Sequence, residues 1–142
     1  MTAANPAAEA GHGTIRLTGL RAHGHHGVYD FEREAGQEFI VDATLELDLG
    51  PAAKSDDIAD TVHYGELADR LVAIITGEPV NLLETLASRL LEACLADDRV
   101  QTATVTVHKP QAPVPHAFTD VSVTLTGSRV PPDASTQLEP PS

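Results

Sequence analysis

Aromatic residues and cysteine are scarce in this chain of 142 residues. Aromatics make up only 4% of it and tryptophan is absent, so any core must consist mostly of leucine, valine, isoleucine and alanine. The single cysteine, Cys94, excludes an intramolecular disulfide and a zinc site built on several cysteines. Because Cys94 falls within an apolar helical pattern, we expect a buried core residue rather than a nucleophile.

Positive charge is also in short supply. Nine lysines and arginines stand against 21 aspartates and glutamates, which gives a net charge of -12 with histidine neutral. Nucleic acids and anionic membranes are bound through clustered basic residues, so we expect neither as a partner. No stretch approaches the roughly 20 apolar residues of a membrane span, and residues 1–13 lack the basic start and apolar run of a signal peptide. We therefore expect a cytoplasmic protein.

Length and composition predict one globular domain between two tails. The chain fits a single domain, and its 42% hydrophobic content can supply a modest core. Residues 1–13 are rich in alanine, and residues 130–142 hold several prolines among small polar residues. We expect both tails to be disordered, with the folded domain spanning residues 14–129.

Alternating apolar and polar residues predict four strands. The clearest lies at residues 39–49, where every second residue from Phe39 to Leu49 is apolar. Similar alternation predicts strands near residues 15–20, 100–108 and 121–125. The polar residues 30–36 and the acidic residues 51–60 are expected to be loops.

Apolar residues at helical spacing predict two helices between the second and third strands. The first carries Leu67, Leu71, Ile74 and Ile75 and stops at Gly77, and the second carries Leu83, Leu86, Leu90 and Cys94. The order strand-strand-helix-helix-strand-strand is typical of an α+β fold, with both helices on one face of an antiparallel sheet. The other face would be polar, carrying Asp42, Thr44, Glu46 and Thr104. A four-stranded sheet leaves two open edges, and pairing of edges between subunits would close a barrel.

Lys109 is the strongest candidate for chemistry. It is one of only two lysines, and it stands where the alternating strand of residues 100–108 runs into a segment with prolines at 110, 113 and 115. Proline fixes the backbone and cannot continue a sheet ladder, so the amine is held at a rigid strand end. That placement suits a proton-transfer group but specifies no reaction.

Histidines offer a competing hypothesis of a metal site. His23, His25 and His26 cluster at a strand end with a spacing that zinc sites use. A catalytic zinc normally has three protein ligands, and the remaining histidines are scattered, so a structural or hydrogen-bonding role is favoured. We predict no metal and no other cofactor.

Three further candidates each have an ordinary explanation. Glu84 follows Asn81 by three residues, as in a helix capping box, although its carboxylate could instead accept two N–H groups of a ligand. Tyr64 lies where the first helix should begin and could simply pack. Glu32 sits in a polar stretch that could be no more than solvated charge.

Five short segments follow one another along the chain. They are Gly24-His25-His26-Gly27, Gly36-Gln37-Glu38-Phe39, Asp60-Thr61-Val62-His63-Tyr64-Gly65, Asn81-Leu82-Leu83-Glu84, and His108-Lys109-Pro110 with Pro113 and Pro115. Each is weakly specific by itself, but the ordered set is highly specific. Together they resemble the dihydroneopterin aldolase family of folate biosynthesis, over nearly all of residues 15–125.

This resemblance implies a T-fold whose sheets join into a barrel, in tetrameric rings or octamers with active sites between neighbouring subunits. The implied reaction cleaves 7,8-dihydroneopterin into 6-hydroxymethyl-7,8-dihydropterin and glycolaldehyde, with epimerisation at C2′ as a further activity. The dihydropterin carries its own electron sink, the C6=N5 imine. The resemblance therefore implies proton transfers alone, without a metal or a lysine Schiff base.

Site roles carry over residue by residue from the resemblance. Glu84 would accept both N–H groups of the 2-amino-4-oxo edge of the pterin, and the Leu83 backbone would contact the same edge. Tyr64 would reach across the subunit interface to cover the ring. Lys109 would be the general acid/base, and Glu32 would lie near the lysine and the substrate hydroxyls.

Three alternatives remain open at this point. An epimerase of the same fold would act on dihydroneopterin triphosphate, although few basic residues are present to bind a triphosphate. A zinc-dependent pterin synthase would use the histidine cluster. A noncatalytic T-fold module would bind pterin only, although the joint presence of Glu32, Tyr64, Glu84 and Lys109 argues against it.

Overall fold

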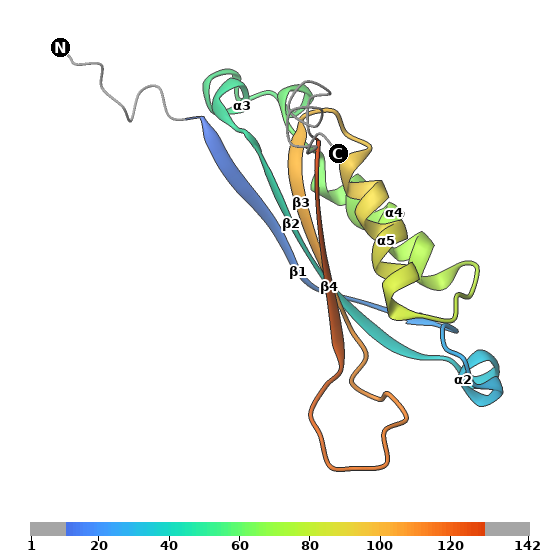
Figure 1. Ribbon diagram of the computed structural model, residues 1–142. Helices are drawn as coiled ribbons and strands as arrows, with labels where there is room; N and C mark the ends of the chain where they lie inside the picture. Colours follow the sequence, from blue (N-terminus) through green and yellow to red (C-terminus); the bar gives the residue numbers. More distant parts are fainter. Residues whose placement is uncertain (1–10, 130–142) are drawn as a thin grey trace, which may run out of the picture.

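A long antiparallel sheet of four strands carries two helices on one face in the computed structural model, which describes residues 11–129 (Figure 1). The elements in chain order are β1 (His12–Gly24), α2 (Asp30–Ala35), β2 (Gln37–Asp48), α3 (Gly50–Ser55), the 3-10 turn η1 (Ile58–Asp60), α4 (Tyr64–Thr76), α5 (Leu83–Leu95), β3 (Val100–His108) and β4 (Ser122–Ser128). The expected α+β order of four strands around two central helices is confirmed.

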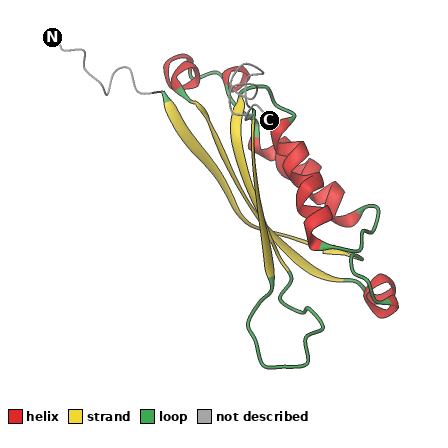
Figure 2. Cartoon of the chain, viewed as in Figure 1, coloured by secondary structure: helices red, strands yellow, loops and turns green. Residues whose placement is uncertain are grey.

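The strands follow their order in the sequence across the sheet, β1-β2-β3-β4, and every neighbouring pair is antiparallel. Figure 2 shows the strands as one sheet with the long helices on one side of it. Ile15 pairs with Leu45, Ala43 with Val105, and Val105 with Leu125. Directly opposed residues share a face, so the alternation of each strand is in phase with its neighbours. β1 and β4 are the two edges of this sheet.

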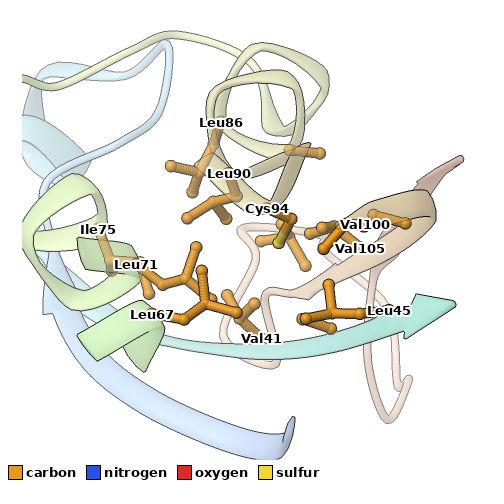
Figure 3. Packing of buried hydrophobic residues seen from close by; sticks show 14 of the residues in the cluster. Val41, Leu45, Leu67, Leu71, Ile75, Leu86, Leu90, Cys94, Val100 and Val105 are labelled. Atoms are coloured by element: carbon orange, nitrogen blue, oxygen red, sulfur yellow. The ribbon is translucent and has the colours of Figure 1, made fainter. Parts of the chain in front are cut away.

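The core lies between the sheet and the two long helices. Every second residue of β2, from Phe39 to Leu47, is at most 1% exposed. Their partners are the buried stripes of α4 and α5 (Figure 3), which consist of Leu67, Leu71, Ile75, Leu86, Ala87, Leu90 and Cys94. Cys94 is 1% exposed, and burial raises the pKa of its thiol to about 11, which confirms the expected core role.

The opposite sheet face is polar, as expected. Asp42, Thr44, Glu46 and Thr104 are all partly exposed there. Threonine and serine hydroxyls bridge β3 and β4 in three consecutive pairs, including Thr104 with Thr126 at 3.0 Å. Cross-strand hydroxyl pairs of this kind stabilise strand register.

Two predicted loops are wrong, because short helices occupy them. Residues 30–36 contain α2, which ends at Gly36 with a φ of 70° that glycine adopts without strain. Residues 51–60 contain α3, with proline in its first turn, and η1. Both helices have six residues or fewer, too few to show a helical period.

The first strand is longer than predicted. A register shift between Leu17 and Leu20 interrupts its alternation, and Gly19 there has a φ of 77°. The expected N-terminal boundary at residue 14 falls inside β1, which begins at His12. The rest of both predicted tails, residues 1–10 and 130–142, lies outside the described residues. Within residues 11–129, no helix has the length and apolarity needed to cross a membrane.

Candidate active site

Lys109 and Glu32 form a buried ion pair at one end of the sheet. The Nζ atom of Lys109 lies 2.6 Å from Oε2 of Glu32, and Glu32 is 3% exposed. Lys109 comes directly after β3, and its backbone N–H donates to the Val121 carbonyl at 2.7 Å. The amine is therefore held at a fixed strand end, as the sequence predicts.

Glu32 is buried because the polar stretch around it folds into α2. Its Oε1 accepts the Tyr29 backbone N–H at 3.3 Å, and its Oε2 accepts the Gln37 side-chain amide at 3.1 Å. Burial by itself would raise the pKa of Glu32, but the hydrogen bond from Lys109 and those from Tyr29 and Gln37 outweigh it and hold that pKa below its ordinary value. Glu32 is thus an ionised, buried carboxylate, and the interpretation of it as solvated surface charge is wrong.

The turn between β1 and α2 packs closely against Glu32. Gly27 has a φ of 152°, and a Cβ atom there would collide with the Glu32 side chain. The Gly27 N–H donates to the Val80 carbonyl at 2.9 Å, which ties this turn to the segment between α4 and α5. A side chain at position 27 would therefore displace the carboxylate that meets Lys109.

The histidine cluster holds loops together. His26 is 2% exposed; its Nε2 donates to the Ile75 carbonyl at 2.7 Å and its Nδ1 accepts the Val80 N–H at 3.0 Å. Burial lowers the pKa of His26 more than the Ile75 bond raises it. His23 and His25 each bond a carbonyl of α2, those of Ala35 and Arg33. Among the described residues, no group of three or more histidines, cysteines or carboxylates is arranged to hold a metal ion.

Leu83 and Glu84 begin α5 at the same end of the molecule. This segment is linked to α2 because the Arg33 guanidinium donates to the Asn81 side chain. The predicted capping box is wrong: the N-cap residue is Leu82, and no side chain among residues 11–129 caps the helix. Glu84 is exposed in the first turn of α5. Its carboxylate is not occupied by a cap, and the helix dipole favours its negative charge.

Tyr64 lies at the opposite end of the helices. It is the first residue of α4 and is 62% exposed. The contacts that fix the Lys109 end, at Ile75 and Val80, come from the last turn of α4 and beyond. Eleven residues of helix separate positions 64 and 75, which corresponds to about 16 Å of rise. Within one chain, Lys109 and Glu32 are in contact, Leu83 and Glu84 lie at the same end of the molecule, and Tyr64 lies at the other end.

Sequence reasoning missed two residues that surround the pair. Gln37 is 8% exposed, donates to Glu32 and leaves its own Oε1 without a partner among the described residues. Its position two residues before Phe39 puts it in the core-facing phase of β2, which is the signal that could have revealed it. His108 bonds two carboxylates, Asp42 and Asp120, each at 2.7 Å. No spacing along the chain links those three residues.

The arrangement combines two chemical capabilities. A buried ammonium–carboxylate pair can hold and relay a proton at a fixed point. A free carboxylate at a helix N-terminus can accept two parallel N–H groups from a planar ligand. Both lie on the same end of the molecule, beside the turn that joins β1 to α2.

Comparisons with known proteins show which family the chain resembles. Residues 15–126 match the model of the FolB dihydroneopterin aldolase family. The dihydroneopterin aldolase of Streptomyces coelicolor is 54% identical over 116 residues, covering 82% of this chain and 98% of that protein. The Bacillus subtilis enzyme of the same name is 41% identical over 113 residues, covering 79% and 94%. The crystal structure of E. coli dihydroneopterin aldolase in complex with neopterin superimposes with a TM-score of 0.75 at 28% identity, covering 82% of this chain and 99% of that one.

Proposed function

Because the chain belongs to the dihydroneopterin aldolase family, an aldehyde-lyase family, we propose that the Lys109–Glu32 pair carries its proton transfers. The reaction is the retro-aldol cleavage of 7,8-dihydroneopterin into 6-hydroxymethyl-7,8-dihydropterin and glycolaldehyde. The observation that supports this role is the 2.6 Å contact between Lys109 and a carboxylate that is 3% exposed. An ion pair withdrawn from water suits a group that must deliver protons to a bound substrate.

The chemistry requires one proton to leave the 2′-hydroxyl as the C1′–C2′ bond breaks. The electron pair of that bond moves into the C6=N5 imine of the pterin, and glycolaldehyde departs as C2′ and C3′. A proton must then return to C1′, which gives the hydroxymethyl product. In its neutral form Lys109 accepts the proton of the 2′-hydroxyl, directly or through an intervening water. The ammonium that results, held in place by Glu32, then delivers a proton to C1′.

Leu83 and Glu84, at the start of α5, bind the pterin ring. The Glu84 carboxylate accepts the two N–H groups of the 2-amino-4-oxo edge, and the Leu83 backbone contacts the same edge. Two features support this role: Glu84 is exposed, and no side chain caps the helix it begins. Paired hydrogen bonds to a carboxylate give both affinity and orientation.

Tyr64 completes the site from a neighbouring protomer. Its exposure and its place at the far end of α4 support a homo-oligomer in which the Tyr64 end of one chain meets the Lys109 end of the next. The unpaired edges β1 and β4 offer the means of assembly, because edge strands can join sheets across a subunit boundary. A tetrameric ring, single or stacked as an octamer, is the proposed assembly.

Incubation with 7,8-dihydroneopterin tests the activity. We expect glycolaldehyde and 6-hydroxymethyl-7,8-dihydropterin in equal amounts, measured by aldehyde derivatisation and chromatography. The C2′ epimer without glycolaldehyde would identify an epimerase instead. If neither glycolaldehyde nor the epimer forms, the proposed function is contradicted.

Mixed oligomers test the shared site. Lys109→Ala and Tyr64→Ala chains are co-expressed with different tags, and the mixed assemblies are isolated. If one protomer supplies Lys109 and its neighbour Tyr64, random mixing leaves about a quarter of the interface sites intact, so activity exceeds that of either variant alone. Mixed assemblies as inactive as the single variants would show that each site uses one chain only.

A further inference from the structure

His108 bridges two carboxylates on the polar face of the sheet. Its Nδ1 lies 2.7 Å from Oδ2 of Asp120, and its Nε2 lies 2.7 Å from Oδ2 of Asp42. Asp42 belongs to β2 and also accepts the Gly19 N–H at 2.8 Å, from the irregular part of β1. The bridge therefore spans three strands and the end of the 109–121 loop, which extends beyond the sheet (Figure 1).

Both bonds require a charged imidazole. A carboxylate oxygen can only accept, whereas a neutral imidazole has one N–H donor and one acceptor nitrogen. Both ring nitrogens lie 2.7 Å from carboxylate oxygens. In a neutral ring, the unprotonated nitrogen would point its lone pair at a carboxylate oxygen, and the two would repel each other. The observed geometry thus belongs to the imidazolium, and loss of its proton must break one of the two contacts.

The bridge stands directly beside the catalytic candidate. His108 is the last residue of β3 and Lys109 follows it, with side chains on opposite faces of the sheet because successive residues of a strand alternate. Asp120 precedes Val121, whose carbonyl accepts the Lys109 backbone N–H at 2.7 Å. Of the two residues that hold the Lys109 backbone, His108 directly before it belongs to the bridge, and Val121 across from it follows another member, Asp120.

We propose that the Asp42–His108–Asp120 bridge is a positioning device for Lys109, fixing both sides of the loop base from which the amine reaches Glu32. This inference rests on the proton-transfer role proposed for Lys109. His108 is a positioning residue, because its ring lies on the face of the sheet opposite the Lys109 side chain. A displacement of about 1 Å in a catalytic group can cost up to about 10²-fold in rate.

The bridge makes turnover depend on pH in a defined direction. The bonds to Asp120 and Asp42 raise the pKa of His108 above its ordinary value, against the smaller effect of burial. The bridge is complete below the ordinary pKa of histidine and is lost as the pH rises through the raised value of the folded protein. We expect kcat to fall with that titration, whereas KM changes little because Glu84 binds the ring.

Other charges on the same face are engaged elsewhere. Arg21 of β1 pairs with Glu38 of β2 at 3.2 Å. On β1, Arg16 lies opposite Thr44 in the register, and Thr44 is two residues farther from His108 along β2 than Asp42 is. On β4, the residue opposite His108 is Ser122, which does not titrate. Asp42 and Asp120 are therefore the charges that face the imidazole.

An Asp120→Asn substitution in the full-length protein tests the proposal. Asparagine keeps an acceptor for the ring and removes one negative charge, so the titration of His108 moves to lower pH. NMR follows the His108 ring protons, assigned by their loss in His108→Gln, and kcat for 7,8-dihydroneopterin is measured over the same pH range. The charge-matched control is Asp98→Asn, in the turn at the other end of β3. It should leave the midpoints of the His108 titration and of the kcat profile unchanged.

The expected result is one midpoint seen by both methods in the wild type, and the same downward shift of both in Asp120→Asn. The positioning role would be overturned if the His108 midpoint moved in Asp120→Asn while the pH profile of kcat did not. It would also be overturned if, in the wild type, the fall of kcat had its midpoint at a pH different from that of the His108 titration. A His108 titration unchanged in Asp120→Asn would overturn the bridge itself. Absence of glycolaldehyde from the wild type would instead refute the proposed function, a result distinguishable because the NMR titration needs no turnover.

Discussion

Glu32 and Glu84 are carboxylates at the same end of the molecule in opposite environments. Glu32 is 3% exposed and accepts bonds from Lys109, Gln37 and Tyr29. Glu84 is exposed at the start of a helix that no side chain caps. The first is committed to partners within the chain, and the second has lone pairs free for a ligand. The difference separates a preorganised proton-transfer region from an open binding region.

The largest effect is expected from removing the cation of the buried pair. Lys109→Ala should lower kcat by at least about 10²-fold, the usual scale for a general acid/base, with pterin affinity largely kept. It also leaves Glu32 buried without its partner, which should lower the free energy of unfolding by about 3 kcal/mol. Steady-state kinetics and urea unfolding measure the two effects. Lys54→Ala, on the exposed helix α3, is the control, and a Lys109→Ala enzyme with its normal rate would contradict the assignment.

The exposed carboxylate should show the reverse pattern. Glu84→Ala removes two hydrogen bonds to a charged acceptor and should weaken pterin binding by about 10²-fold, at about 1.5 kcal/mol each. The free energy of unfolding should fall by less than about 1 kcal/mol, the scale of a contact between an exposed charge and the helix dipole. Fluorescence titration with a pterin measures the affinity, with Glu92→Ala on the same helix as control. Near-normal affinity would rule out the ring contact.

Tyr64 should give a smaller effect, because only its hydroxyl is expected to take part in the proton steps. Tyr64→Phe keeps the ring over the pterin and should lower kcat by about tenfold, below the range for a primary acid/base group. Tyr64→Ala should additionally raise KM through the lost ring contact. If Tyr64→Phe and Tyr64→Ala had the same KM and the wild-type kcat, Tyr64 would contribute packing alone.

The buried environment of Glu32 should also show in acid, as the smallest of these effects. Since the pKa of folded Glu32 lies below its unfolded value, Glu32 contributes stability that is present above the unfolded pKa and lost as the pH falls through the folded one. The fall of the urea midpoint between pH 7 and pH 3 should therefore be shallower in Glu32→Gln than in the wild type. A Glu32→Gln curve parallel to the wild type would show that the ionised Glu32 carboxylate adds no pH-dependent stability.

Much of the fold could be predicted from local pattern. The period of two at residues 39–49 and the helical spacing from Leu67 to Ile75 reflect which side of each element is buried, and burial is what the sequence records most directly. The short helices α2 and α3 were not predicted, because a helix of six residues is too short to show a helical period in the sequence. The capping box at Asn81 failed because its side chain instead accepts a hydrogen bond from Arg33, 48 residues away.

The sequence by itself determined the strand and helix order, the polar and apolar faces, and a lysine held at a strand end by prolines. Only the tertiary structure decided which charges meet. Glu32 and Lys109 are far apart in the chain, and so are Asp42 and His108, yet each pair is in contact. The physical reason is that periodicity encodes burial along one element, whereas an ion pair depends on where separate elements end against one another.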